Sequence, residues 1–378
     1  MPLNTIPNKG LTSRGYPSDR LVTPIIINGD MSVAQRGTSV SGITSTAYYT
    51  LDRIRTNISS LGTWTQSRST DVPTGQGFAY SLKMDCTTAD ASPSASDYLN
   101  VEQRFEGQNL QNLKKGTSNA ESLTLSFWVK SNKTGTYIAE IIDTDNDRNN
   151  VNAYTINSAN TWEKKTITLS GDTTGTLTND NNVSMRATFW LGAGSDYTSG
   201  TLQSGWGARN NANRLVGQVN LADSTSNEWY ITGVQLEVGE FDSTTIPSFP
   251  FESYESNLRK CQRYFETFPS NGGDGVIGYG YGSGSDTART MFPFKVTKRS
   301  APTMSDSLST SRQYRINFTA TDGTAVNQNS SNTPGFGSVC TLNSGYMNLS
   351  GFSSIGGGHN GFLIYNNSTT LLSADAEL

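Results

Sequence analysis

Short stretches of alternating apolar and polar residues recur between residues 21 and 240. In ESLTLSFWVKS, Leu123, Leu125 and Phe127 fall on one face of an extended strand, and small polar residues fall on the other. GTYIAEIID, EKKTITLSGD, VSMRATFWLGAG and EWYITGVQLEVG are also alternating or apolar, and Gly, Asp or Asn residues bound them. Such strands, joined by turn-rich connections of unequal length, predict an all-β fold with an antiparallel jelly-roll β-sandwich.

Helical periodicity is rare along the chain. Residues 46–57 and 95–107 each have the spacing of a short helix. The clearest helical pattern is SYESNLRKCQRYFET, where Ser253 is a suitable N-cap. The apolar positions that recur at helical spacing in it are Tyr254, Leu258, Cys261 and Phe265. We predict that this helix packs between two domains or against its copies in an oligomer.

These patterns divide the chain into four parts. We expect an extended arm over residues 1–24, the jelly roll over 25–245, a linker and helix over 246–267, and a small C-terminal β domain over 268–378. The arm is either a disordered tail or a segment ordered by docking on a neighbour. The terminal sequence LLSADAEL is predicted to form an edge strand.

Composition and charge narrow the classes of partner. A net charge of −4, with 16% charged residues, provides no basic field for phosphates and argues against nucleic acid. No apolar stretch is long enough to cross a membrane, and the N-terminal residues have no apolar core of the kind found in signal peptides. We therefore expect a protein that is made in a cytoplasm and does not insert into membranes.

Few residues suggest catalysis. His359 is the single histidine and lies in a glycine-rich loop, which argues against a Ser-His-Asp triad, a Cys-His pair or a multi-histidine metal site. Acidic residues for a pair of glycosidase carboxylates are present, but none has a local signature. We predict a protein without enzymatic activity or cofactor, and a glycan depolymerase is the alternative.

Alternating acidic residues in IIDTDNDRNN resemble the start of a calcium-binding loop. They are Asp143, Asp145 and Asp147. The EF-hand pattern fails further on, because Arg148 stands where glycine is required and Tyr154 where glutamate is required. The favoured interpretation is a solvated hairpin tip, where Asp and Asn stabilise turns. A structural calcium site on these oxygens is the alternative.

Aromatic residues in a long loop are the candidates for ligand contact. FWLGAGSDYTSGTLQSGWGARNN leaves a strand and is rich in Gly, Ser and Asn. Aromatic faces can cover the C–H surface of a sugar while neighbouring amides bind its hydroxyl groups. The candidate glycan contacts are Trp206, Tyr197, Asn210 and Asn211. Because tryptophan is usually well buried, a core position is the alternative for Trp206.

Several motifs together carry a family resemblance. They are INGDMSVAQRGTS, SLTLSFWVKSNKTGTYIAEIID, ANTWEKKTITLSGDTTG, EWYITGVQLEVGEFDST and FESYESNLRKCQRYFET. Over about residues 24–267 the chain resembles tail-fibre-like virion structural proteins of bacteriophages, including marine phages and cyanophages. The C-terminal sequences VTKRSAPTM and SADAEL are similar to the tip domains that follow in that group.

The resemblance implies a particular function and location. It implies a jelly roll similar to carbohydrate-binding modules, carried on the outer surface of the virion as a tail fibre, a fibre-like spike or a capsid-surface fibre. It also implies a homotrimer that contacts other proteins of the tail or capsid and attaches to host surface glycans. The alternative is a capsid or tail decoration protein that binds only other virion proteins.

Overall fold

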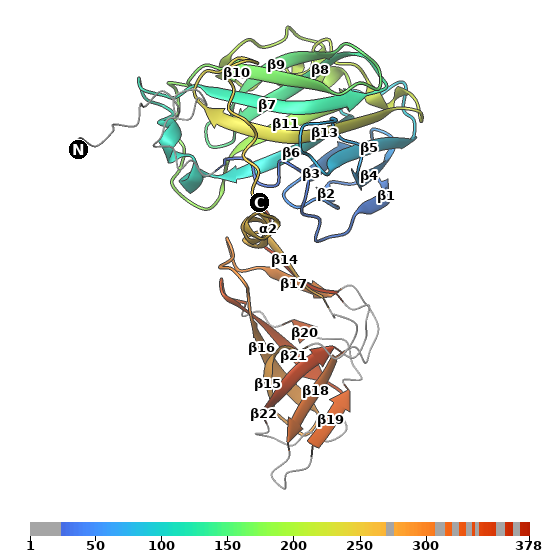
Figure 1. Cartoon of the computed structure of the whole chain (residues 1–378), viewed down its shortest axis with the longest axis vertical. Helices are drawn as coiled ribbons and strands as arrows, with labels where there is room; N and C mark the ends of the chain where they lie inside the picture. Colours follow the sequence, from blue (N-terminus) through green and yellow to red (C-terminus); the bar gives the residue numbers. More distant parts are fainter. Residues whose placement is uncertain are drawn as a thin grey trace, which may run out of the picture. The chain divides into compact units, whose positions relative to one another are not determined.

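A computed structural model of the protein describes residues 24–269, 276–306, 314–319, 325–329, 335–336, 340–352, 360–365 and 371–378. The chain forms two compact units, Met1–Ser253 and Tyr254–Leu378 (Figure 1). The helix expected in a linker over 246–267 is therefore part of the C-terminal unit. The predicted arm, apart from Pro24, and His359 lie outside the described residues.

The N-terminal unit is a sandwich of two antiparallel sheets. The first sheet has the order β1 (Ser39–Ile43), β4 (Thr63–Ser69), β5 (Ser81–Thr88), β13 (Glu228–Val238), β7 (Leu123–Ser131) and β10 (Glu163–Leu169). The second has the order β12 (Trp206–Ala208), β9 (Arg148–Ile156), β8 (Gly135–Asp143), β11 (Val183–Ala193), β6 (Tyr98–Glu106), β3 (Arg55–Ser59) and β2 (Ala47–Tyr48). The chain crosses repeatedly between the sheets, since β5, β7 and β10 belong to the first and β6, β8 and β11 to the second. This confirms the predicted jelly roll.

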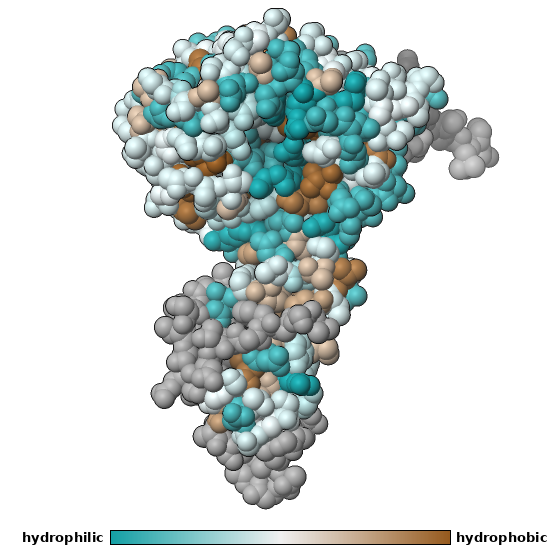
Figure 2. Space-filling view, turned by 180° about the vertical axis from the view of Figure 1, so that it is seen from behind, coloured by the Kyte–Doolittle hydropathy of each residue, from teal (hydrophilic) through white to brown (hydrophobic). Residues whose placement is uncertain are grey.

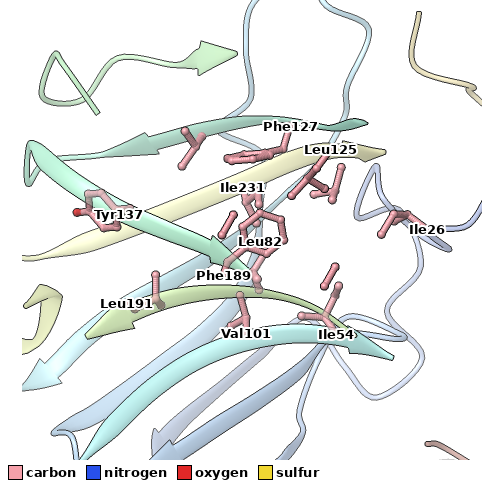
Figure 3. Packing of buried hydrophobic residues seen from close by; sticks show 14 of the residues in the cluster. Ile26, Ile54, Leu82, Val101, Leu125, Phe127, Tyr137, Phe189, Leu191 and Ile231 are labelled. Carbon is pink, nitrogen blue, oxygen red and sulfur yellow. The ribbon is translucent and has the colours of Figure 1, made fainter. Parts of the chain in front are cut away.

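The core of this unit fills the space between the two sheets. Figure 3 shows Phe127 of β7 and Ile231 of β13 directed toward Phe189 of β11 and Val101 of β6. The rings of Phe127 and Phe189 meet edge to face, with centroids 5.0 Å apart. Each such side chain contributes about 1.5–3 kcal/mol by burial. On the side seen in Figure 2, hydrophilic residues cover most of this unit and hydrophobic residues form small patches.

Two expected short helices are not formed. Residues 46–57 contain β2 and the start of β3, and residues 95–107 contain β6. The physical reason is visible in β6, where Leu99 and Val101 enter the core while their neighbours in sequence face outward. This period of two suits a strand, and pairing with β3 and β11 outweighs the local helical spacing. The described helices and 3-10 turns of this unit are α1 (Ser195–Thr198), Gly107–Asn109, Gln111–Leu113, Asn211–Asn213 and Leu221–Asp223.

The C-terminal unit contains α2 (Tyr254–Gln262) and two antiparallel sheets. Three strands have the order β14 (Phe265–Pro269), β23 (Leu371–Asp375) and β17 (Thr303–Asp306). Seven have the order β19 (Ala325–Asn329), β18 (Tyr314–Thr319), β22 (Asn360–Tyr365), β15 (Val276–Gly282), β16 (Thr287–Pro293), β21 (Ser344–Ser350) and β20 (Gly335–Phe336). The predicted terminal edge strand is instead the middle strand of its sheet, because β23 pairs with both β14 and β17.

The predicted docking helix is shorter than its apolar spacing suggests. It ends at Gln262, and Phe265 begins β14, where it pairs with Asp375. Cys261 and Phe265 are buried, Leu258 is half-buried, and Tyr254 is 57% exposed. A role of these residues in oligomer contacts stays a prediction. Within the described residues, neither helix has the length and apolar character needed to span a bilayer.

Candidate functional site

A cleft of about 380 Å³ opens on the outer face of the second sheet of the N-terminal unit. It exists because successive residues of a strand point to opposite faces, so one set fills the core and the other faces outward. Its floor comes from β3, β6, β8 and β11, and one wall comes from the loop that follows β11. This face therefore brings together residues from strands that are far apart in sequence.

Strand register arranges the floor in rows. Pairing of β3 with β6, and of β6 with β11, gives the rows Asn57–Asn100–Trp190, Arg55–Glu102–Thr188 and Arg104–Arg186. The first row contains two amide side chains and an aromatic ring. The other two rows together contain three arginines, a glutamate and a threonine. Planar polar groups and rings thus lie within one cleft.

Glu102 is the carboxylate at the centre of the floor. Its Oε1 accepts hydrogen bonds from Arg104 Nε at 2.6 Å and from Arg55 Nη1 at 3.4 Å. Its Oε2 accepts one from Arg186 Nη1 at 3.4 Å. Burial alone would raise the pKa of Glu102, but the guanidinium groups of Arg186 and Arg104 hold it below the usual range. Glu102 is therefore ionised and acts as a counter-charge to the arginines.

Residues 194–215, which follow β11 and are called the wall loop below, are held close to the sheet by backbone packing. A Cβ atom on Gly194, where β11 ends, would lie 1.8 Å from the carbonyl oxygen of Ser94, so glycine is required there. Further along, the Leu215 amide donates to the Tyr197 carbonyl at 2.9 Å. The ring of Tyr197 lies 5.6 Å from that of Tyr98 and 5.9 Å from that of Trp190. Three aromatic rings therefore gather at one end of the cleft.

A buried ion pair fixes this aromatic end. Arg214 donates from Nε and Nη2 to the two carboxylate oxygens of Glu140, both at 2.9 Å. Glu140 also accepts hydrogen bonds from Asn149 at 2.6 Å and from the indole of Trp190 at 2.8 Å. The guanidinium lies 4.8 Å from the centroid of the Trp190 ring. The contacts of Arg214 tie the wall loop to β8 and β11.

The structure brings two of the four predicted glycan contacts into the cleft. Tyr197 and Asn211 line it. Asn210 caps a 3-10 turn, because its side chain accepts a hydrogen bond from the Ala212 amide at 3.2 Å. Trp206 belongs to β12 and is half-buried against the core, with its indole donating to the Ser170 carbonyl at 2.8 Å. The roles of these four residues in glycan contact stay predictions.

Sequence reasoning missed the arginines of the floor. Arg104 and Arg186 alternate with core residues in β6 and β11, and Arg55 does so in β3. Each looks like an ordinary solvated residue of a strand when it is read alone. The only available signal was arginine on the polar face of predicted strands, and only the cross-strand register shows that the three converge.

The alternating acidic residues each have a separate partner. Asp143 is fully buried and pairs with Lys115 at 2.6 Å, while Asp145 accepts a hydrogen bond from the Thr178 amide at 2.8 Å. Asp147 pairs with Arg209 at 2.5 Å. In the described parts of the chain, no group of three His, Cys, Asp or Glu side chains could hold a metal ion. Residues 144–147 form the turn between β8 and β9, which fits the hairpin-tip interpretation for Asp145 and Asp147, but Asp143 is buried beside Lys115 and is not solvated.

Comparison with known proteins finds likeness only among solved structures. No protein-family model and no curated protein matches the sequence. The enzymatically active domain of tailspike protein 4 from bacteriophage CBA120 is 14% identical with a TM-score of 0.28, covering 57% of this chain and 21% of that chain. The chain thus spans about a fifth of that structure.

Carbohydrate-binding modules are also among the similar structures. The family 11 module from Clostridium thermocellum, solved with a β-1,3-1,4-mixed-linked tetrasaccharide, is 13% identical with a TM-score of 0.25, covering 56% of this chain and 94% of that module. TmCBM61, solved with β-1,4-galactotriose, is 10% identical with a TM-score of 0.27, covering 57% of this chain and 99% of that module.

Proposed function

We propose that the protein binds a glycan in the cleft on the second sheet of its N-terminal unit and catalyses no reaction. The observation that carries this proposal is the joint presence of aromatic rings, asparagines and arginines on one cleft floor and wall. Aromatic faces suit the C–H surfaces of sugars, and planar amide and guanidinium groups suit their hydroxyl groups. The proposal is tested by titrating the intact protein with defined oligosaccharides.

The carboxylate of the cleft floor supports binding without catalysis. A glycosidase needs a carboxylic acid with a raised pKa that can protonate the leaving oxygen. The pKa of Glu102 is lowered by its arginine neighbours, so this carboxylate is not in a state to donate a proton to a substrate. Glu140 does not line the cleft, and both of its oxygens accept hydrogen bonds from Arg214.

Removing the half-buried ring of Tyr197 from the cleft wall should weaken glycan binding. We expect Tyr197→Ala to lower the affinity about tenfold, which corresponds to ~1.4 kcal/mol, because the sugar loses its stacking surface. Isothermal titration calorimetry measures the change. The matched control is Tyr254→Ala, which removes an exposed tyrosine of α2 and should leave the affinity unchanged. Equal losses in the two variants would contradict the role of the cleft.

We also propose that the protein belongs to the outer surface of a phage particle, as a tail fibre or fibre-like spike that attaches to the host cell. The resemblance of the sequence motifs to those of phage virion proteins supports this location, and such a protein would be made in the host cytoplasm. Mass spectrometry of purified particles tests it, and absence of the chain from them would contradict it. Incorporation into particles without any glycan binding would favour the decoration-protein alternative.

An exposed apolar row on the C-terminal unit supports the proposed homotrimer. Pairing across β22, β15, β16 and β21 aligns Phe362, Tyr279, Met291 and Tyr346. Tyr279 is 64% exposed and Met291 is 58% exposed, although neighbouring residues on the opposite face pack the unit's own core. An apolar surface of this kind commonly lies against another copy of the chain.

Disrupting this row should therefore dissociate the trimer. We expect the double variant Tyr279→Ser, Met291→Ser to fall from the mass of three chains to that of one, because two central apolar contacts are lost from every interface. Light scattering measures the mass. A wild-type protein with the mass of one chain would contradict the trimer, and a variant that keeps the trimer mass would contradict the role of this row.

A further inference from the structure

The cleft carries a charge opposite to that of the whole chain. The protein has a net charge of −4, yet the cleft is lined by five arginines and by one carboxylate, that of Glu102. Two further carboxylates compensate the positive charge of the arginines in the wall, since Glu140 pairs with Arg214 and Asp147 pairs with Arg209. Among the described residues, five guanidinium groups thus face three carboxylates, which leaves an excess of positive charge within a confined space.

The charge of Arg186 is only weakly compensated. Among the described residues its ion pair with Glu102 is long at 3.4 Å, as is that of Arg55, and Glu102 is bound more closely by Arg104. Burial and the positive charges of Arg104, Arg209 and Arg214 lower the pKa of the Arg186 guanidinium. The neighbouring arginines thus repel one another across the floor.

Two buried polar atoms beside this charge lack a protein partner. The Nε of Arg186 and the hydroxyl of Thr188 have no hydrogen-bond partner among the described residues. Both residues line the cleft and lie two positions apart on the outer face of β11. Buried polar groups are normally satisfied. Such atoms also occur elsewhere among the described residues, but these two lie beside the excess positive charge of the cleft, where a ligand can supply acceptors.

We infer that the cleft selects an acidic glycan, whose carboxylate or sulfate group lies over Arg186. The inference rests on the proposed function and names the class of sugar that the site binds. A guanidinium offers two parallel donors that match the paired oxygens of a carboxylate or sulfate. A neutral sugar would leave the excess positive charge uncompensated, whereas one anionic group would balance part of it.

The test compares three classes of oligosaccharide on the intact protein. An array carries neutral, uronic-acid and sulfated oligosaccharides together with a single-stranded oligonucleotide. We expect binding of uronic-acid or sulfated members at least about tenfold tighter than that of their neutral counterparts, and the two acidic sets separate carboxylate from sulfate. Raising the ionic strength from about 0.05 M to about 0.5 M should weaken this binding, because salt screens exposed charges.

The outcomes separate this inference from the proposed function. Preference for neutral members would overturn the acidic selectivity while glycan binding stands. Binding of no oligosaccharide would contradict both, and tighter binding of the oligonucleotide would show that the arginines serve a different polyanion.

Variants test whether the arginines of the cleft cause the selectivity for acidic sugars. Arg186→Gln should weaken acidic binding about tenfold and weaken neutral binding by much less, since only the acidic sugar loses a charge-assisted hydrogen bond. Arg209→Gln, at the half-exposed rim, provides a second variant if the first disturbs folding. The matched control is Arg259→Gln on the exposed face of α2, which should change neither affinity. Equal losses for acidic and neutral sugars in both cleft variants would overturn the inference.

Discussion

Replacing Arg214 with methionine is expected to lower the free energy of unfolding of the N-terminal unit by about 3–5 kcal/mol. The variant leaves the carboxylate of Glu140, whose side chain is fully buried, with only the neutral donors of Asn149 and Trp190. A buried charge without a counter-charge is costly, because the interior solvates it poorly. Urea unfolding followed by tryptophan fluorescence measures the loss, since all six tryptophans lie in this unit.

Two further variants separate the buried charge from other effects of the substitution. The double variant Arg214→Met, Glu140→Gln should recover much of the lost stability, because the uncompensated charge is removed. Arg209→Met breaks the exposed pair with Asp147 and should cost no more than about 1 kcal/mol. Equal costs for Arg214→Met and Arg209→Met would contradict the account of the wall loop as fixed by a buried ion pair.

The second large effect concerns the C-terminal unit. Lys298 and Glu266 pair at 2.5 Å, and both side chains are fully buried. Lys298 also donates to the carbonyl oxygen of Gln262, at the end of α2. We expect Lys298→Met to destabilise this unit by about 3–5 kcal/mol, because Glu266 is left charged and unpaired. Hydrogen exchange of β14, β17 and β23, followed by mass spectrometry, measures the loss of protection.

The neighbouring lysine provides the control for this experiment. The side chain of Lys295 is exposed, so Lys295→Met should change the stability by no more than about 0.5 kcal/mol. The double variant Lys298→Met, Glu266→Gln should be more stable than Lys298→Met alone. Unchanged exchange of the three strands in Lys298→Met would show that the buried pair contributes little.

The sandwich was predictable because its signal is local. The alternation of Leu123, Leu125 and Phe127 with small polar residues fixes both a strand and the face that enters the core. The helix was predictable only in part. Its apolar spacing continues to Phe265, but the pairing of that residue with Asp375, far along the chain, turns it into a strand.

The candidate site was less predictable because it depends on register. Arg55, Arg104 and Arg186 are far apart in sequence and meet only because β3, β6 and β11 are neighbours. The arrangement of the acidic segment was unpredictable for the same reason, and both a hairpin tip and a calcium site were open interpretations. Lys115 is distant in sequence from Asp143, yet its ammonium group fills the position beside that carboxylate. Local pattern carries no information on such contacts.

The most direct test of the central claim locates the bound glycan. Hydrogen exchange of the intact protein is compared with and without the tightest oligosaccharide of the array. Binding in the cleft predicts slower exchange in β6, in β11 and in the wall loop around Tyr197, with no change in β4 or β5 of the other sheet. Protection confined to the other sheet or to the C-terminal unit would contradict the cleft as the glycan site.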